Sequence, residues 1–306
     1  MNSIAAPILV SEPVARLNCP APRRSVSVVM VVYMTGEALE QSLACVLADP
    51  LVDELVVVDN GSTPVEAQRL RALAARDGRV VLKTGHGNVG FARGANLGAA
   101  NARGDLLVFL NPDAFLQAGC VAALAREIED RPAPCIVGGR VLNADGTEQR
   151  GARRGEITPI SALMSMSGLA QFAPALRRFE VHWEAEALPE QAVSAPTISG
   201  ACFCMRREDF DGVGGFDEGY FLHVEDVDLC WRVRQAGGEV LFHPKAEVVH
   251  IGGTSQTSPL KVEFHKGVGL ARYFRKRASG LGPRILTWAL SPLVILAAVV
   301  RPLVRR

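Results

Sequence analysis

The stretch Leu106–Asp113, with the sequence Leu-Leu-Val-Phe-Leu-Asn-Pro-Asp, constrains the fold of this chain more than any other. Five consecutive apolar residues are typical of a strand buried on both faces, as strands are inside a parallel sheet. The strand should end at Asn111-Pro112, because proline lacks a backbone N–H and restricts the residue before it. Asp113 would then lie just beyond the carboxyl end of a buried strand, where open α/β sheets bind ligands. A carboxylate there suits a divalent cation that carries a diphosphate.

Apolar runs and helical stripes alternate along the first half of the chain. This spacing predicts an α/β fold with a mostly parallel central sheet and helices on both faces. The expected strands are Val26–Tyr33, Glu54–Asp59, Val80–Lys83, Leu106–Leu110 and Cys135–Leu142, and the expected helices are Glu37–Leu47, Pro64–Ala75, Phe91–Ala102 and Gln117–Glu129.

The pattern weakens over residues 150–196, which begin with a basic cluster at Arg150, Arg153 and Arg154. We expect an insertion in this range, either a loop that covers an acceptor or a plain surface excursion. Regular elements then return, and we expect one domain over residues 25–255. The later elements are a strand at Thr197–Met205, a helix at Glu225–Ala236 and two short strands at Val240–Phe242 and Ala246–His250.

Composition narrows the class of protein. A formal net charge of +1 over 306 residues argues against wholesale nucleic-acid binding. Seven scattered cysteines with no CxxC pair favour reduced thiols in a cytosolic protein over disulfides or a zinc site. Residues 1–24 lack a basic start and hold several prolines, so we expect a loosely ordered leader rather than a secretory signal.

Asp59 ends the second expected strand, at the same sheet edge as Asp113. Two carboxylates at one edge repel each other unless a cation or donor groups lie between them. Asp59-Asn-Gly-Ser could also be a simple turn, since these residue types favour turns. The presence of Asp113 favours a role in ligand binding.

Gly85-His-Gly-Asn-Val-Gly90 matches the GxGxxG dinucleotide fingerprint. In nicotinamide enzymes this loop normally follows the first strand, whereas here two strand–helix units precede it. An NAD(P)-dependent oxidoreductase is therefore the less favoured alternative. Under either interpretation the glycines allow the backbone to approach phosphates closely.

Glu225, Asp226 and Asp228 place three acids within one helical turn. Acids near a helix N-terminus stabilise the helix by up to about 1 kcal/mol each, which would explain their presence. Three acids in four residues, however, exceed what helix capping needs. A carboxylate among such neighbours would make a good general base. Trp231 could offer its face to a sugar ring, although such a tryptophan is more often part of the core. His250 closes the last expected strand, where it could be structural or complete a metal site with Asp113.

Five stretches together resemble the family 2 glycosyltransferases, and most closely their rhamnosyltransferase-like branch in cell-surface polysaccharide and cell-wall synthesis. The resemblance covers about residues 25–255 and implies a GT-A fold with a Rossmann-like sheet. It also implies inverting transfer from a nucleotide-sugar. The stretches are Val56–Ser62, Gly87–Asn96, Leu110–Asp113, Ser199–Cys202 and Glu225–Arg232.

The resemblance also implies roles for individual residues. Asp226 matches the catalytic base, with Glu225 beside it, and His250 matches a position associated with the diphosphate and the metal. Asn111 stands where other members of the family carry Asp, which leaves Asp113 as the one carboxylate of the metal motif. We therefore expect a Mg or Mn ion to arrive with the donor and to be held by Asp113 and the donor diphosphate. Trp231 and Asp228 are weaker candidates for acceptor contacts. Residues expected to bind a dTDP- or UDP-sugar donor are Asp59, Asn88, Gly90, Arg93, Asn96, Asn111 and Asp113.

The tail, residues 256–306, combines a basic helix at Leu260–Arg277 with an uncharged run at Ile285–Val300. The run is shorter than the ~20 residues of a spanning helix, and Ser291-Pro292 should break it. We expect an interfacial or re-entrant segment that, helped by the charges of the basic helix, rests on the anionic inner face of the cell membrane, consistent with a polyprenyl-linked glycan acceptor. A terminal helix docked on the enzyme or on a partner subunit is the alternative. A catalytically silent sugar-binding protein of the same fold is the alternative to an enzyme.

Overall fold

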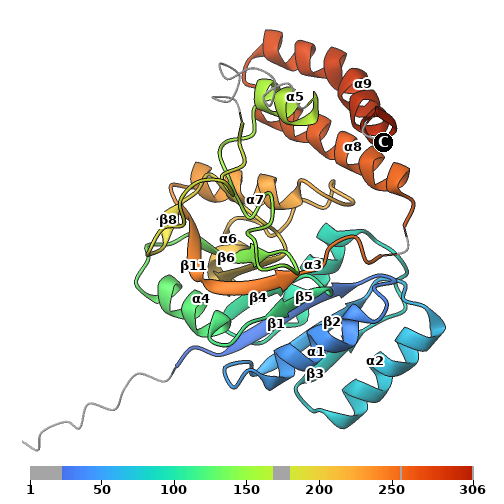
Figure 1. The fold of residues 1–306 in the computed structure, drawn as a ribbon, viewed down its shortest axis with the longest axis vertical. Coiled ribbons are helices and arrows are strands. Elements are labelled where there is room, and N and C mark those ends of the chain that lie inside the picture. The colour runs from blue at the N-terminus through green and yellow to red at the C-terminus, as the bar shows by residue number, and fades with distance from the viewer. Residues whose placement is uncertain (1–22, 168–179, 256, 305–306) are drawn as a thin grey trace, which may run out of the picture.

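The computed structural model describes residues 23–167, 180–255 and 257–304 (Figure 1). The leader expected at residues 1–24 lies almost wholly outside these ranges, as does part of the expected insertion. The six cysteines recorded within the described ranges form no disulfide, as expected for reduced thiols.

The strands form one central sheet and a small two-stranded sheet. They are β1 Val26–Val32, β2 Glu54–Asp59, β3 Val80–Lys83, β4 Leu106–Leu110, β5 Ala114–Leu116, β6 Cys135–Leu142, β7 Arg153–Arg154, β8 Val193–Ser194, β9 Thr197–Ile198, β10 Cys202–Arg206 and β11 Glu239–His250.

The central sheet has the order β3-β2-β1-β4-β10-β6-β11-β5, with β8 also paired to β11. β1, β2, β3 and β4 pair in parallel, as do β6 and β11, while β10 lies antiparallel between β4 and β6. The predicted α/β class and mostly parallel sheet are therefore confirmed. The parallel strands β2 and β4 bring Asp59 and Asn111 to the same edge.

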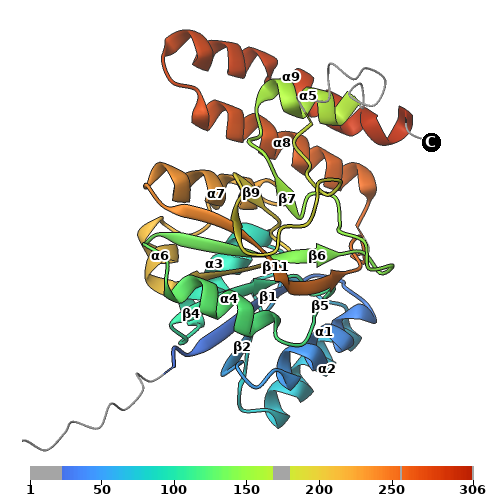
Figure 2. The same cartoon turned by 60° about the vertical axis from the view of Figure 1, so that its left-hand side comes forward.

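Helices cover both faces of this sheet (Figures 1 and 2). One buried cluster contains Leu43 of the first helix and Leu124 of the fourth, and a second contains Ala95 of the third and Leu229 of the seventh. The helices are α1 Ala38–Ala48, α2 Pro64–Arg76, α3 Phe91–Asn101, α4 Cys120–Glu129, α5 Pro159–Ser167, α6 Arg207–Gly212, α7 Glu225–Gln235, α8 Pro259–Arg277 and α9 Leu281–Val304.

The structure differs from the expected strands at the ligand edge. The two short strands expected around Pro244 are one strand, β11, whose register against β6 shifts between His243 and Glu247. The shift absorbs the proline, which cannot donate to the ladder. β5 was not expected, because three residues after a turn carry no readable periodicity. It pairs antiparallel with the end of β11.

The tail forms a pair of helices, α8 and α9, that lies on the α7 side of the sheet (Figure 2). The expected break at Ser291-Pro292 is wrong, because α9 runs continuously through it. Ser291 Oγ donates to the Thr287 carbonyl at 2.7 Å and accepts from Arg275 of α8 at 2.8 Å. These side-chain bonds and the packing on α8 support the helix where the proline lacks its N–H.

Candidate active site

Asp113 and His250 meet where β5 pairs with the end of β11. Ala114 lies opposite His250 in this pairing. Nε2 of His250 is 3.2 Å from Oδ1 of Asp113, and the Thr254 hydroxyl donates to Oδ2 at 2.9 Å. Burial alone would raise the pKa of Asp113, but the hydrogen bond and charge of His250 outweigh it and lower that pKa. The fold thus brings together the two residues expected to hold a cation.

Gln149 fixes the orientation of the His250 ring. Its Nε2 donates to the His250 carbonyl at 3.1 Å and to Asn143 Oδ1 at 3.2 Å. Because a backbone carbonyl can only accept, Oε1 is the atom that faces His250 Nδ1, at 2.7 Å. Nδ1 therefore carries a hydrogen, as it does in metal-binding histidines, and Nε2 is the ring nitrogen that faces Asp113. No sequence motif indicated Gln149, which lies 101 positions from His250.

The side chains at this edge provide some, but not all, of the ligands that a divalent cation needs. A carboxylate oxygen and an imidazole nitrogen are both suitable ligands, and the Asn111 side chain lies 3.2 Å from His250 Nε2. Across residues 23–167, 180–255 and 257–304, no three His, Cys, Asp or Glu side chains form a group that could hold a metal. A cation here would complete its coordination from a substrate phosphate, as Mg²⁺ commonly does.

Asp59 closes β2 with its carboxylate turned into the following loop. The backbone N–H groups of Gly61 and Ser62 donate to Oδ1 at 3.2 and 2.8 Å, and the Thr84 hydroxyl lies 3.4 Å from Oδ2. Burial favours the neutral acid, but the bonds from Ser62 and its neighbours outweigh it and lower the pKa of Asp59. The turn is therefore real, and contact of Asp59 with a donor stays a prediction.

Asn60 holds the glycine loop against this sheet edge. Its Nδ2 donates to Asn88 Oδ1 at 3.2 Å and to the Gly90 carbonyl at 3.1 Å, and its Oδ1 accepts from Val89 N–H. Gly90 has a φ of +86°, and a Cβ there would stand 2.6 Å from the Phe221 carbonyl oxygen. Only glycine fits this place. The loop therefore lies between the end of β2 and the segment before α7.

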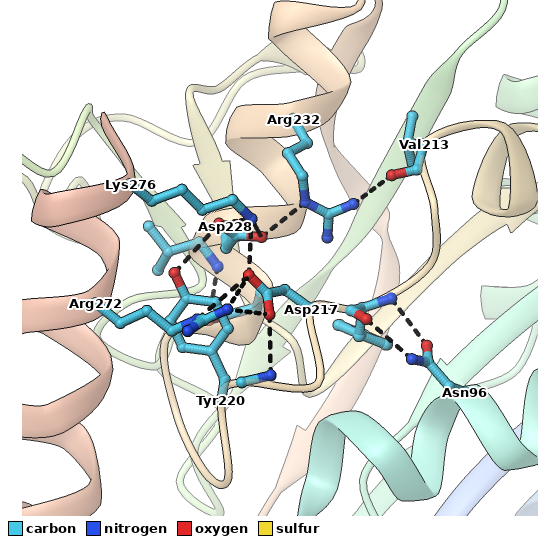
Figure 3. Close-up of polar contacts among 12 residues, drawn as sticks. Asn96, Val213, Asp217, Tyr220, Asp228, Arg232, Arg272 and Lys276 are labelled. Atoms are coloured by element: carbon cyan, nitrogen blue, oxygen red, sulfur yellow. Dashed lines mark hydrogen bonds and ion pairs between the residues drawn. The ribbon is translucent and has the colours of Figure 1, made fainter. Parts of the chain in front are cut away.

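Arg93 and Asn96 continue this contact along α3. Arg93 is exposed and lies 3.4 Å from Glu218. The Asn96 side chain binds both backbone groups of Phe216, donating to its oxygen at 2.9 Å and accepting from its N–H at 2.8 Å (Figure 3). Asn96 therefore anchors the segment before α7, and donor contacts for both residues stay predictions.

A strained turn precedes α7. His223 and Val224 have φ values of +67° and +75°, which is rare for a β-branched residue. Each such residue costs about 1–3 kcal/mol, and strain of this kind clusters at functional sites. Gly269 of α8 permits close packing here, since a Cβ on it would stand 2.9 Å from the His223 carbonyl oxygen. The turn sets the direction in which α7 begins.

Glu225 and Asp226 are the first two residues of α7, and their environments differ. Glu225 is 7 % exposed, and its Oε2 has no hydrogen-bond partner among the described residues. Burial, and then the charge of Asp226, raises the pKa of Glu225 to about 8. Asp226 instead receives a hydrogen bond from Arg154 at 2.7 Å and one from Gly200 N–H at 3.1 Å. The pair therefore combines a buried neutral acid with a charged, partnered carboxylate.

Asp228 is fully buried in an ion-pair cluster between α7 and α8 (Figure 3). It accepts from Arg232 at 2.7 Å and from the Tyr220 hydroxyl at 3.2 Å, and Lys276 of α8 lies 2.8 Å from it. A carboxylate with these partners belongs to the scaffold. Its burial does not suit the acceptor contact expected for it.

Asp217 extends the cluster on the α8 side. It pairs with Arg272 at 2.8 Å and with Lys276 at 2.9 Å. Burial would raise the pKa of Asp217, but the bonds from Lys276 and Arg272 lower it to about 2. Trp231 packs edge-on against Tyr273 of α8 at 6.4 Å between ring centroids, and its acceptor contact stays a prediction.

Two family models match the chain. Glycosyl transferase family 2 matches residues 27–214, and the N-terminal domain of galactosyltransferase matches residues 185–254. Together they span every element from β1 to β11.

Among curated relatives, an N-acetylglucosaminyl-diphospho-decaprenol L-rhamnosyltransferase of Mycobacterium tuberculosis is 30% identical over 237 residues. The match covers 73% of this chain and 75% of the relative. Among solved structures, GalNAc-T7 with UDP, GalNAc and Mn²⁺ has a TM-score of 0.59 at 17% identity, covering 89% of this chain and 55% of that one. The Pyrobaculum calidifontis mannosyltransferase PcManGT with GDP-Man and Mn²⁺ has a TM-score of 0.58 at 17% identity, covering 92% and 75%. Both show the GT-A fold that was expected.

Proposed function

Because the chain belongs to glycosyl transferase family 2 and is rhamnosyltransferase-like, we propose that it is an inverting, cation-dependent rhamnosyltransferase. We infer a dTDP- or UDP-linked donor, with dTDP-rhamnose first, and an N-acetylglucosaminyl-diphospho-polyprenol acceptor in cell-surface polysaccharide synthesis. The observation that carries the proposal is the contact of Asp113 with His250 at the carboxyl edge of the sheet. The family match favours sugar transfer over the nicotinamide alternative.

The donor diphosphate would lie at this edge. Asp113 Oδ1 and His250 Nε2 would hold a Mg or Mn ion, which when bound neutralises charge on the leaving diphosphate. Gln149 keeps His250 turned toward Asp113. The loop from Asn88 to Gly90 supplies backbone that can approach phosphate closely.

Asp226 would act as the general base. The acceptor hydroxyl gives its proton to the Asp226 carboxylate while its oxygen attacks the anomeric carbon from the face opposite the diphosphate. The bond from the anomeric carbon to the diphosphate breaks, and the configuration inverts. Glu225, with a pKa raised to about 8, holds its proton at neutral pH, so the negative charge of the pair stays on Asp226.

The tail supports a membrane location for this chemistry. One helix among the described residues is long and apolar enough to cross a membrane, at Leu281–Val300, and only 11% of that window is buried. Leu281, Trp288 and Leu293 are 77%, 66% and 60% exposed. We propose that α9 rests this enzyme on the inner face of the cell membrane, where a polyprenyl-linked acceptor is available.

An assay with dTDP-[¹⁴C]rhamnose and N-acetylglucosaminyl-diphospho-polyprenol tests the proposal, with UDP-sugars as the second donors. We expect chloroform-soluble product with Mg²⁺ or Mn²⁺ and none with EDTA.

Asp226→Asn should lower turnover by orders of magnitude while donor binding, measured by calorimetry, survives. Donor binding without transfer or donor hydrolysis in the wild type would instead favour a silent sugar-binding protein. Near-normal turnover in Asp226→Asn would show that Asp226 is not the base.

A further inference from the structure

Arg154 occupies one oxygen of the Asp226 carboxylate. Its Nη2 donates to Oδ2 at 2.7 Å and to the Ile198 carbonyl at 3.1 Å. The side chains of Arg154 and Asp226 are only 16% and 18% exposed. A charge-assisted bond with so little solvent around it fixes geometry far better than a surface ion pair does.

Asp226 Oδ2 accepts a second hydrogen bond, from the backbone. Gly200 N–H reaches Oδ2 at 3.1 Å, and a Cβ on residue 200 would stand 3.1 Å from the Asp226 Cβ, so a larger residue here would press on the Asp226 side chain. The other oxygen, Oδ1, accepts from Val227 N–H at 2.8 Å. Because a carboxylate oxygen has about two lone-pair sites, Oδ2 is saturated and Oδ1 keeps one site for a proton.

The backbone around Arg154 is also fixed. β7 pairs antiparallel with β9, with Arg154 opposite Thr197. Arg153 points to a different partner, Glu148, at 2.8 Å, so the two neighbouring arginines are engaged separately. The start of the insertion is therefore neither a plain surface excursion nor merely a cover, because it delivers a guanidinium to the carboxylate of α7.

We propose that Arg154 is a positioning residue, anchoring Oδ2 of Asp226 so that Oδ1 receives the proton of the acceptor hydroxyl. This inference rests on the proposed function. As the acceptor oxygen bonds to the anomeric carbon, its proton passes to Oδ1 and the diphosphate leaves with the electron pair of the broken bond. Arg154 stays protonated throughout.

The kinetic test uses the full chain with dTDP-rhamnose and N-acetylglucosaminyl-diphospho-polyprenol. Arg154→Met should lower kcat on the order of 100-fold with the donor KM unchanged, because a misplaced base slows only the chemical step. Arg154→Lys should recover part of the loss. In an Asp226→Asn background, Arg154→Met should cause little further loss, because it acts through that carboxylate. Arg153→Met is the matched control and should lower the melting temperature with kcat near wild type.

A second experiment needs no substrate and so applies to variants whose rates are too low to measure. In thermal unfolding, the decrease in melting temperature of the double variant Arg154→Met/Asp226→Asn should be smaller than the sum of the decreases of the two single variants. Wild-type kcat in Arg154→Met, a raised donor KM alone, or additive losses would each overturn the inference. If the wild type transfers no sugar, the proposed function fails. If wild type and Asp226→Asn behave as proposed and Arg154→Met is normal, only this inference fails.

Discussion

Glu225 and Asp226 are neighbouring acids that the fold treats in opposite ways. Glu225 is packed into the start of α7, and its Oε2 has no hydrogen-bond partner among the described residues. Asp226 instead accepts hydrogen bonds from a guanidinium and from a backbone N–H. Pairs of titratable groups pushed apart by their surroundings mark acid and base assignments in active sites. The difference has a consequence for stability that can be measured without any substrate.

Glu225→Gln should become increasingly stable relative to wild type as the pH rises. The folded state raises the pKa of Glu225 from 4.5 to about 8, through burial and then the charge of Asp226. The stability contributed by the bound proton is complete below 4.5 and is lost as the pH rises through 8. Glutamine does not ionise, so the melting-temperature difference should grow in its favour from about pH 5 to pH 9. The exposed Glu208→Gln is the control, and a pH-independent difference for Glu225→Gln would contradict the account.

Motifs predicted several of these side chains but not their partners. Asp113, His250 and Asp226 stand at strand ends or a helix start, so local pattern was enough to single them out. Gln149 and Arg154 act through contacts 101 and 72 positions away in the chain. Such contacts depend on strand order and on β5, which no local periodicity reveals.

α8 is the element that connects the tail to the site. Its Gly269 lies against the strained turn at His223 and Val224, and its Lys276 joins Asp217 to Asp228 (Figure 3). The basic character of this helix was predicted, but its charges were expected to face a membrane. Lys276 instead forms ion pairs with carboxylates of the catalytic domain, because the face of α8 that carries it packs toward α7.

Lys276→Met should lower the free energy of unfolding by about 1–3 kcal/mol, because it removes a partner from the fully buried Asp228. Denaturant unfolding followed by circular dichroism measures this loss. Lys261→Met, on an exposed position of the same helix, is the control and should stay within about 0.5 kcal/mol of wild type. Equal stability of the two variants would show that the cluster does not stabilise the α7–α8 contact.

Among the described residues, an α/β domain carries one mostly exposed apolar helix, α9. Fold class, the strands of the amino-terminal half and the edge that carries the site follow from the alternation of apolar runs. The continuity of α9 does not, because Pro292 favours a break unless tertiary contacts such as that of Arg275 with Ser291 support the helix. The uninterrupted helix strengthens the expectation of membrane contact.

The full chain should float with anionic phosphatidylglycerol vesicles, and Leu286→Glu/Leu293→Glu should abolish flotation. Both leucines are exposed on α9, and each buried charge at a membrane interface is unfavourable. Leu188→Glu, at an exposed leucine outside the tail, is the matched control. Equal flotation of all three proteins would contradict a membrane role for α9, and a stable oligomer lost in the double variant would instead favour a docked partner subunit.

The anomeric configuration of the transferred sugar shows whether the transfer is a single displacement. In the proposed mechanism one carboxylate, Asp226, deprotonates the acceptor while the diphosphate leaves from the opposite face, in a single displacement. Nuclear magnetic resonance of product formed from dTDP-rhamnose should therefore show the configuration opposite to that of the donor. Retained configuration would contradict Asp226 as the base of a single displacement and would require a different mechanism at this site.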